Sequence, residues 1–182
     1  MLDNYTPTDL FRMRLHYEDG FTKLHGSATA QYNGNISGME WQVPGSCDVM
    51  GYGYSYDGLN RLKQAEHGTQ DASTHWTHDS KYSSSYTYDL NGNILTLQRE
   101  GLTVGGASPN YGTIDDLTYS YAGNQLMGVS DAITASFPDI DHFQDGHAGI
   151  DYSYDANGNM IQDLNRSLSV LYNHLNKPTY VQ

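Results

Sequence analysis

The chain has 182 residues, of which 9 are Lys or Arg and 21 are Asp or Glu, so its formal net charge is −12 at pH 7. This excess of acidic residues argues against a partner made of nucleic acid or an anionic membrane surface, because both need basic patches. The 16 tyrosines and 19 glycines favour a turn-rich β structure, since tyrosine packs its ring on a pleated surface and keeps its hydroxyl in water.

The sequence shows no sign of a membrane span or of a disulfide. No apolar run reaches the length needed to cross a bilayer, and Met1-Leu2-Asp3-Asn4 lacks the basic start and apolar stretch of a secretory signal peptide. Cys47 is the only cysteine, which excludes a disulfide within the chain, and we interpret it as a small packing residue.

Residues 1–30 are expected to form an N-terminal segment, consisting of a polar linker and one strand over residues 10–17. A second strand is predicted over residues 39–43, where Pro44-Gly45 ends it. Residues 31–182 form the second region, in which one short pattern recurs. Because internal repetition sets the architecture of a chain, this pattern governs the rest of the prediction.

The clearest copy of the pattern covers residues 86–95. Tyr86 and Tyr88 alternate with polar residues, and Asp89 and then Asn91-Gly92 precede an apolar stretch. Since Asn and Gly both tolerate positive φ, we expect Asn91-Gly92 to be the two-residue loop of a type I′ hairpin, with Tyr88 opposite Leu95.

Related copies begin at residues 54, 119 and 152, and the second tyrosines of the four copies are 32, 33 and 33 residues apart. A diverged fifth copy covers residues 171–178. We expect a structural role for the motif residues of the four copies, which are Tyr54, Tyr56, Asp57, Tyr86, Tyr88, Asp89, Asn91, Gly92, Tyr119, Tyr121, Tyr152, Tyr154, Asp155, Asn157 and Gly158.

A second strand is expected after each Tyr-x-Tyr strand, over residues 62–65, 94–99, 126–129 and 160–163. A single hairpin is marginal in water, whereas stacked hairpins support one another. The sequence therefore predicts an all-β fold of about ten to thirteen short strands. We expect the antiparallel hairpins to join edge to edge into a continuous twisted, curved sheet.

The repeated Tyr-x-Tyr-Asp-x-x-Gly-Asn pattern resembles the tyrosine-aspartate (YD) repeats of Rhs proteins, of the shell-forming subunits of bacterial Tc toxins and of animal teneurins. Residues 86–95 and 152–161 match fully, while residues 119–126 have a shorter loop and Ala122 in place of the aspartate. The resemblance covers about residues 30–182. It implies one sector of a β-shell that encloses a passenger, such as a toxin domain. The self-cleavage segment of that family has no counterpart here, so no protease or toxin role carries over to any residue.

Asp57, Asp89 and Asp155 are expected to accept hydrogen bonds from turn amides. The tyrosine rings are expected to form ladders that brace the sheet. The alternative is a carbohydrate- or protein-binding module that uses exposed tyrosines, with Trp41 and Trp76 as its candidate ligand face.

Three arrangements of residues superficially suggest a metal site. The first is Asp89-x-Asn91-x-Asn93, but Ile94 stands where a calcium-binding loop needs glycine. The second is His75-x-x-His78-Asp79, whose spacing would suit zinc but which has no further ligand pair. The third is the acidic loop around His142, with Asp139, Asp141 and Asp145. We favour turns and solvated loops in all three and predict neither a metal nor a cofactor.

Paired carboxylates could hydrolyse glycosides, but 21 acidic residues supply such pairs by chance. We find no serine nucleophile elbow and no glycine loop for phosphate, so the chain is predicted not to be an enzyme. The expected function is architectural, as part of a larger extracellular or surface-exposed bacterial protein. The expected partners are the remainder of a longer parent chain, other copies joined through sheet edges, and a glycan or protein ligand in the alternative interpretation.

Overall fold

The computed structural model describes the whole chain except residues 1–9, 22–23, 25–27, 44–47 and 138–139. Within the described part, all regular structure is β-strand in antiparallel pairs, so the predicted all-β class is confirmed. The thirteen strands of this part are β1 (Arg12–His16), β2 (Gly38–Gln42), β3 (Val49–Tyr56), β4 (Leu62–Gln70), β5 (Trp76–His78), β6 (Ser84–Tyr88), β7 (Ile94–Val104), β8 (Asn110–Ala122), β9 (Gln125–Asp131), β10 (Tyr152–Tyr154), β11 (Met160–Asp163), β12 (Leu168–Tyr172) and β13 (Pro178–Val181). No helix of the described residues is long and apolar enough to cross a membrane.

The chain divides into two compact units, which we call unit 1 and unit 2. Unit 1 contains residues 1–86 and 99–112, and unit 2 contains residues 87–98 and 113–182. The expected N-terminal segment, residues 1–30, belongs to unit 1. Its predicted strand is confirmed as β1, which pairs with β2.

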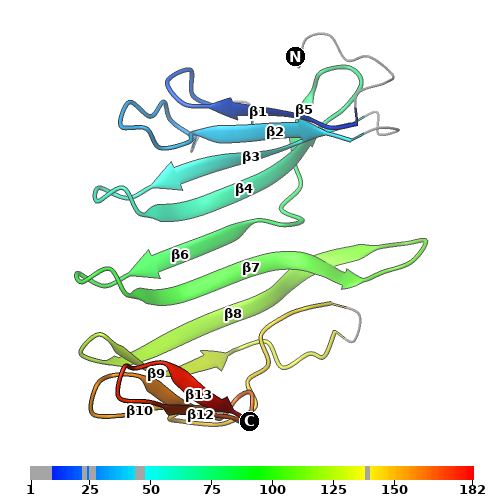
Figure 1. Cartoon of the computed structure of the whole chain (residues 1–182). Helices are drawn as coiled ribbons and strands as arrows, with labels where there is room; N and C mark the ends of the chain where they lie inside the picture. Colours follow the sequence, from blue (N-terminus) through cyan, green and yellow to red (C-terminus); the bar gives the residue numbers. More distant parts are fainter. Residues whose placement is uncertain (1–9, 22–23, 25–27, 44–47, 138–139) are drawn as a thin grey trace. The chain divides into compact units, whose positions relative to one another are not determined.

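Strands β1 to β4 of unit 1 pair in chain order (Figure 1). On its other side, strand β4 has two partners. Its first part pairs with β6, where Gln64 lies opposite Ser85, and its last part pairs with β5, where Gly68 lies opposite His78. We call the point where the partner changes the fork of β4. The strand predicted over residues 62–65 continues in the structure to Gln70, and β5, which the sequence did not predict, follows it. Apolar periodicity could not indicate these strands, because polar residues such as Gln70 and Thr77 dominate them.

One face of the unit 1 sheet is lined by glycines from three adjacent strands. Gly38 lies opposite Gly53, and Gly51 lies opposite Gly68. The buried Phe21, Leu24 and Ala28, together with the half-buried Trp76, form a cluster on this side. A Cβ on Gly51 would lie 2.8 Å from the Trp76 ring, and a Cβ on Gly38 or Gly68 would collide with Phe21 or Leu24, respectively. The sheet carries glycine there because the covering side chains approach its backbone closely.

In unit 2, strand β8 pairs with β9, and strands β10 to β13 pair in chain order in a four-stranded sheet. The predicted second strands of the repeats appear as β4, β7, β9 and β11. Three buried carboxylates, those of Asp115, Asp151 and Asp163, hold nearby backbone amides in this unit. The buried apolar residues of unit 2 are few and include Ile114, Leu117 and Val129.

The turn predicted at Asn91-Gly92 was wrong in its length. Asp89 N–H donates to Asn93 O (2.9 Å) and Gly92 N–H donates to Asp89 O (3.2 Å), which makes Leu90, Asn91 and Gly92 a three-residue loop. Only Gly92 of these three has a positive φ, of 94°. This is a turn with an adjacent bulge rather than a type I′ turn. Asn-Gly occurs in two-residue loops and also in three-residue loops with a bulge, so the sequence pattern alone did not distinguish the two loop lengths.

Candidate functional site

The motif aspartates form the repeated turns of the sheet. Asp89 Oδ1 accepts the backbone N–H groups of Asn91 (2.9 Å) and Asn93 (2.8 Å), and its Oδ2 accepts the side-chain amide of Asn93 (2.8 Å). Asp155 makes the same three bonds with Asn157 and Asn159. The prediction that these carboxylates bind turn amides is confirmed, and their oxygens are thereby occupied.

Asp57 makes an equivalent turn, with its Oδ2 accepting the guanidinium Nε–H of Arg61 at 2.6 Å. Two further turns of this kind were missed or only partly recognised. Asp71 accepts the N–H groups of Ser73 and His75, and Asn173 accepts those of Leu175 and Lys177. The signal that could have found them is an Asp or Asn five residues before the start of a return strand, without any requirement for glycine.

The turn hydrogen bonds favour the charged form of each motif carboxylate. The side-chain amide of Asn93 holds the pKa of Asp89 below its usual value, and Asn159 does the same for Asp155. The backbone N–H of Arg61 is the main cause of the lowered pKa of Asp57. Each carboxylate therefore contributes most to the turn when it is ionised.

The second tyrosine of a repeat reaches back to the turn of the preceding hairpin. Tyr121 Oη donates to the carbonyl of Ile94 (2.9 Å), and Tyr154 Oη donates to the carbonyl of Leu126 (2.8 Å). Each acceptor is the first or second residue of the return strand that follows a turn. The same bond recurs from Tyr172 to Met160 (3.0 Å) and from Tyr56 to Ile36 (2.7 Å). We call this series the hydroxyl ladder.

In four places the hydroxyl ladder joins a hairpin, through a side chain, to the backbone just beyond the preceding turn. Burial raises the pKa of Tyr56, Tyr121 and Tyr154, which keeps their hydroxyls protonated as donors. The remaining motif tyrosines, Tyr54, Tyr86, Tyr88, Tyr119 and Tyr152, are half-buried on the strands. These positions support the interpretation that the tyrosines brace the sheet.

Asparagine side chains join successive turns in pairs. Asn91 and Asn93 both donate to Asn124 Oδ1, at 3.3 and 3.2 Å. In the same way Asn157 and Asn159 donate to Asn176 Oδ1, at 3.1 and 3.0 Å, and Asn33 donates to Asn60 Oδ1 at 2.6 Å. An Asn-Gly-Asn turn is thus followed each time by a turn that supplies an accepting asparagine. The sequence repeat gave no indication of this alternation.

The two tryptophans of the predicted ligand face are not brought together. Trp41 stacks on Tyr52 (ring centroids 5.6 Å apart, planes at 22°), and Tyr52 stacks on Tyr54 (6.0 Å, 16°). Trp76 instead packs edge-on against Phe21 (5.1 Å) and over Gly51. Since Gly51 and Tyr52 are neighbours in β3, Trp76 and Trp41 lie on opposite faces of the sheet.

Trp41 is part of a row of aromatic side chains in unit 1. His67 lies edge-on to both Tyr52 (5.2 Å) and Tyr82 (5.3 Å), and Tyr82 in turn meets Tyr111 (5.5 Å). Burial raises the pKa of Tyr52 to about 12. In the stacked part of the row, Trp41 and Tyr54 lie against Tyr52, so these rings cover part of the faces that a sugar would stack on.

Buried His67 lies at the fork of β4, where the partner strand changes from β6 to β5. Its Nδ1 lies 2.7 Å from Asp79 Oδ1, its backbone N–H donates to Ser83 Oγ (2.9 Å), and Lys81 Nζ lies 3.2 Å from Asp79 Oδ2. Asp79, which follows the His75-x-x-His78 spacing that was weighed and disfavoured as a zinc site, binds His67 and Lys81. Among the described residues no three His, Cys, Asp or Glu side chains are grouped to hold a metal ion. Asp139 and Cys47 lie outside the described residues.

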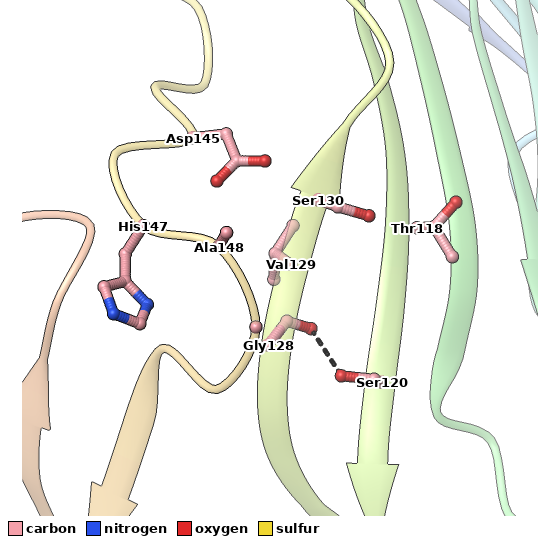
Figure 2. A pocket seen from close by; sticks show the side chains of 9 residues that line it. Thr118, Ser120, Gly128, Val129, Ser130, Asp145, His147 and Ala148 are labelled. Atoms are coloured by element: carbon pink, nitrogen blue, oxygen red, sulfur yellow. Dashed lines mark hydrogen bonds between the residues drawn. The ribbon is translucent and has the colours of Figure 1, made fainter.

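Unit 2 contains a pocket of about 300 Å³ between β8, β9 and the loop that precedes β10 (Figure 2). His147 Nδ1 lies 3.5 Å from Oδ1 of the buried Asp151, whose Oδ2 accepts the backbone N–H of Val129 (2.7 Å). Ser120 Oγ donates to Gly128 O (3.3 Å), on the other side of the pocket from His147 (Figure 2). Since Ser120 and His147 are not adjacent, the pocket does not supply a serine nucleophile with a base.

No protein-family model matches this chain, and no curated protein matches it. Its function is therefore inferred from the geometry of the repeats.

Proposed function

We propose that this chain is a scaffold segment that contributes strands to a larger sheet, as part of a longer YD-repeat protein of the Rhs kind. The observation that carries the proposal is the hydroxyl ladder. Four tyrosines, Tyr56, Tyr121, Tyr154 and Tyr172, each bind the backbone just beyond the preceding turn. These bonds stabilise the stacking of hairpins, and each of them occupies a tyrosine hydroxyl that could otherwise donate to a ligand.

The motif carboxylates support the same proposal. Asp57, Asp89 and Asp155 use their oxygens for turn amides and for one neighbouring side chain each, so little acceptor capacity is left for a substrate. We propose no catalytic role for them. The continuous twisted and curved sheet implied by the resemblance would be the product of many such hairpins, and its passenger would be supplied by the parent protein.

The proposed setting is outside the cell or on its surface, in a bacterium. A net charge of −12 favours solubility and disfavours binding to nucleic acid. The alternative of a carbohydrate-binding face is the weaker proposal, because Trp41 and Tyr52 are stacked on each other.

The size of the native protein tests the scaffold proposal. An antibody raised against the 182-residue chain should detect, in an immunoblot of the source cells and their medium, a band far above 20.3 kDa. The purified 182-residue chain, added to the same extract, is the size control and reports any proteolysis. A native band at 20.3 kDa would contradict the proposal, because the chain would then act as a self-sufficient domain.

A further inference from the structure

His16, the last residue of β1, is buried between two carboxylates. Its Nδ1 lies 2.7 Å from Oδ2 of Asp19, and its Nε2 lies 2.7 Å from Oε1 of Glu40. The side chain of His16 is 4% exposed and that of Glu40 is 0% exposed, whereas that of Asp19 is 54% exposed. Each ring nitrogen therefore faces a carboxylate at hydrogen-bonding distance, and one of the two carboxylates is fully buried.

The two distances determine how many protons the ring carries. A neutral imidazole has one N–H donor and one bare nitrogen, and an ionised carboxylate can only accept. A neutral His16 would satisfy one carboxylate and direct a nitrogen lone pair at the other. An imidazolium donates from both nitrogens and supplies the positive charge that the buried carboxylate of Glu40 requires. The geometry thus calls for one proton more than a neutral ring holds.

His67, a second buried histidine of unit 1, shows what a single carboxylate requires. Its Nδ1 lies 2.7 Å from Oδ1 of Asp79, and Lys81 Nζ lies 3.2 Å from the other oxygen of Asp79. The ring meets Tyr52 and Tyr82 edge-on. A neutral ring with its proton on Nδ1 satisfies this arrangement, so His67 is an internal reference for a buried neutral histidine.

The ring of His16 also supports the apolar cover of the sheet. Phe21 lies against it, with the ring centroids 4.7 Å apart, and a Cβ on Gly38, which pairs with His16, would collide with the same Phe21. Glu40 belongs to β2, whereas Asp19 follows β1 in the chain. Hydrogen bonds to both carboxylates therefore join β1 and Phe21 to the rest of the sheet.

Other charged or titratable groups on the same face lie further along or across the sheet. By strand register they are Arg12 and Arg14 in β1, Glu66 in β4 and His78 in β5. The two arginines oppose a positive charge on His16, and Glu66 favours it. Because Coulombic interactions weaken with distance, the two carboxylates at 2.7 Å from the ring dominate.

We propose that His16 is a proton-dependent latch of unit 1, which as an imidazolium bridges Glu40 and Asp19 and holds β1 and Phe21 on the sheet, and which releases them when it loses its second proton. The hydrogen bond from His16 also holds the pKa of Asp19 below its usual value, as a bridge to a cation does. A histidine of an unfolded chain loses this proton near about pH 6.5. Above that pH the folded chain holds one proton more than the unfolded chain, so unit 1 loses stability as the pH rises.

The ring nitrogens of the isotope-labelled 182-residue chain report the protonation state directly by NMR. At about pH 7.5 both nitrogens of His16 should give resonances of protonated nitrogen, whereas His67 should give one protonated and one bare nitrogen. A bare nitrogen on His16 at this pH would overturn the proposal. The measurement needs no substitution, so it decides the question even where a variant fails to fold.

A pair of variants tests the effect on stability. The melting temperature of unit 1, followed by the fluorescence of Trp41 and Trp76, should fall by about 5 °C or more between pH 6 and pH 9 in the parent chain. Glu40→Gln offers a side-chain amide to a neutral ring and should remove most of this fall. Glu18 is exposed, so Glu18→Gln removes one charge beside the site and should keep the fall of the parent chain.

Two results of this comparison would also overturn the proposal. The first is a Glu40→Gln chain whose melting temperature falls with pH as steeply as that of the parent chain. The second is an equal loss of pH dependence in Glu18→Gln, which would assign the effect to net charge rather than to the ring of His16.

Discussion

Unit 1 and unit 2 carry the same turns and the same hydroxyl ladder, but they fill their interiors differently. In unit 1 a glycine-lined sheet face is covered by Phe21, Leu24 and Ala28, with Trp76 packed beside them. In unit 2, Asp115 and Asp151 are almost fully buried, and each accepts a backbone N–H from another segment, that of Phe143 (2.6 Å) or Val129 (2.7 Å).

The repeat provides the turns and the hydroxyl ladder in both units, and each unit adds its own interior. The ladder and the turns hold neighbouring hairpins in register in either unit. The apolar cover gives unit 1 a core of its own, whereas unit 2 depends more on buried hydrogen bonds to carboxylates. We therefore expect apolar truncations to act mainly on unit 1, and loss of single hydrogen bonds to act measurably on unit 2.

Truncation of an apolar side chain that covers the glycine-lined face of unit 1 should have the largest effect on stability. Phe21 is 1% exposed and contacts both His16 and Trp76, so Phe21→Ala should destabilise unit 1 by about 4 kcal/mol. Amide hydrogen exchange should show the loss in β2 to β4 and leave β10 to β12 protected. Phe11→Ala, at a side chain that is 56% exposed, is the control. Equal loss of protection in both units would contradict the comparison.

Filling the glycine-lined face should have the next largest effect. A Cβ on Gly68 would collide with Leu24 and lie 2.5 Å from the backbone carbonyl oxygen of Thr77, which cannot move freely. We expect Gly68→Ala to cost about 2 kcal/mol in a denaturant titration that follows the tryptophan fluorescence of unit 1. Gly58→Ala adds a methyl group with no heavy atom within 4 Å and should change little. An unchanged midpoint for Gly68→Ala would show that the cover is loosely packed.

Removing one hydroxyl of the ladder should have a smaller effect, confined to unit 2. Tyr154→Phe deletes the bond to the Leu126 carbonyl and should lower stability by about 1 kcal/mol. Exchange of the β9 and β10 amides reports the change. Tyr180→Phe removes only an exposed bond to Gln182 and serves as the control. If the two substitutions had equal effects, the ladder would not be a stabilising feature.

The smallest effect is expected from the charge of a turn aspartate, and it depends on pH. Because the folded-state pKa of Asp155 is lowered, its ionised form stabilises the fold above the ordinary Asp pKa of about 4, and this contribution disappears as the pH falls through the lowered value. Asp155→Asn should keep the turn, since Asn173 forms the same turn naturally, but lose the charge.

Melting temperatures of the parent chain and of Asp155→Asn measured from pH 7 to pH 2 test this sign. The parent chain should be more stable at pH 7, and the difference should shrink below pH 4. A difference that stays constant, or that grows in acid, would mean that the hydrogen bonds of the turn do not depend on the carboxylate charge.

Part of the candidate site could be predicted because it depends on neighbours in sequence. Asp89 binds Asn91 and Asn93, all within four residues, so a local pattern contains the whole turn. The loop length was still misjudged, because Asn-Gly suits both two- and three-residue loops. The partners of the tyrosine hydroxyls could not be predicted, because Tyr121 and Ile94 are 27 residues apart.

The sequence by itself determined the β class, the repeat and the turn aspartates, because alternation, positive φ at glycine and local hydrogen bonding are properties of short segments. The tertiary structure alone decided that Trp76 covers glycines while Trp41 stacks on Tyr52. It also decided that His67 meets Asp79 at the fork of β4. These features depend on which strands become neighbours, and strand pairing is fixed by contacts between residues far apart in the chain.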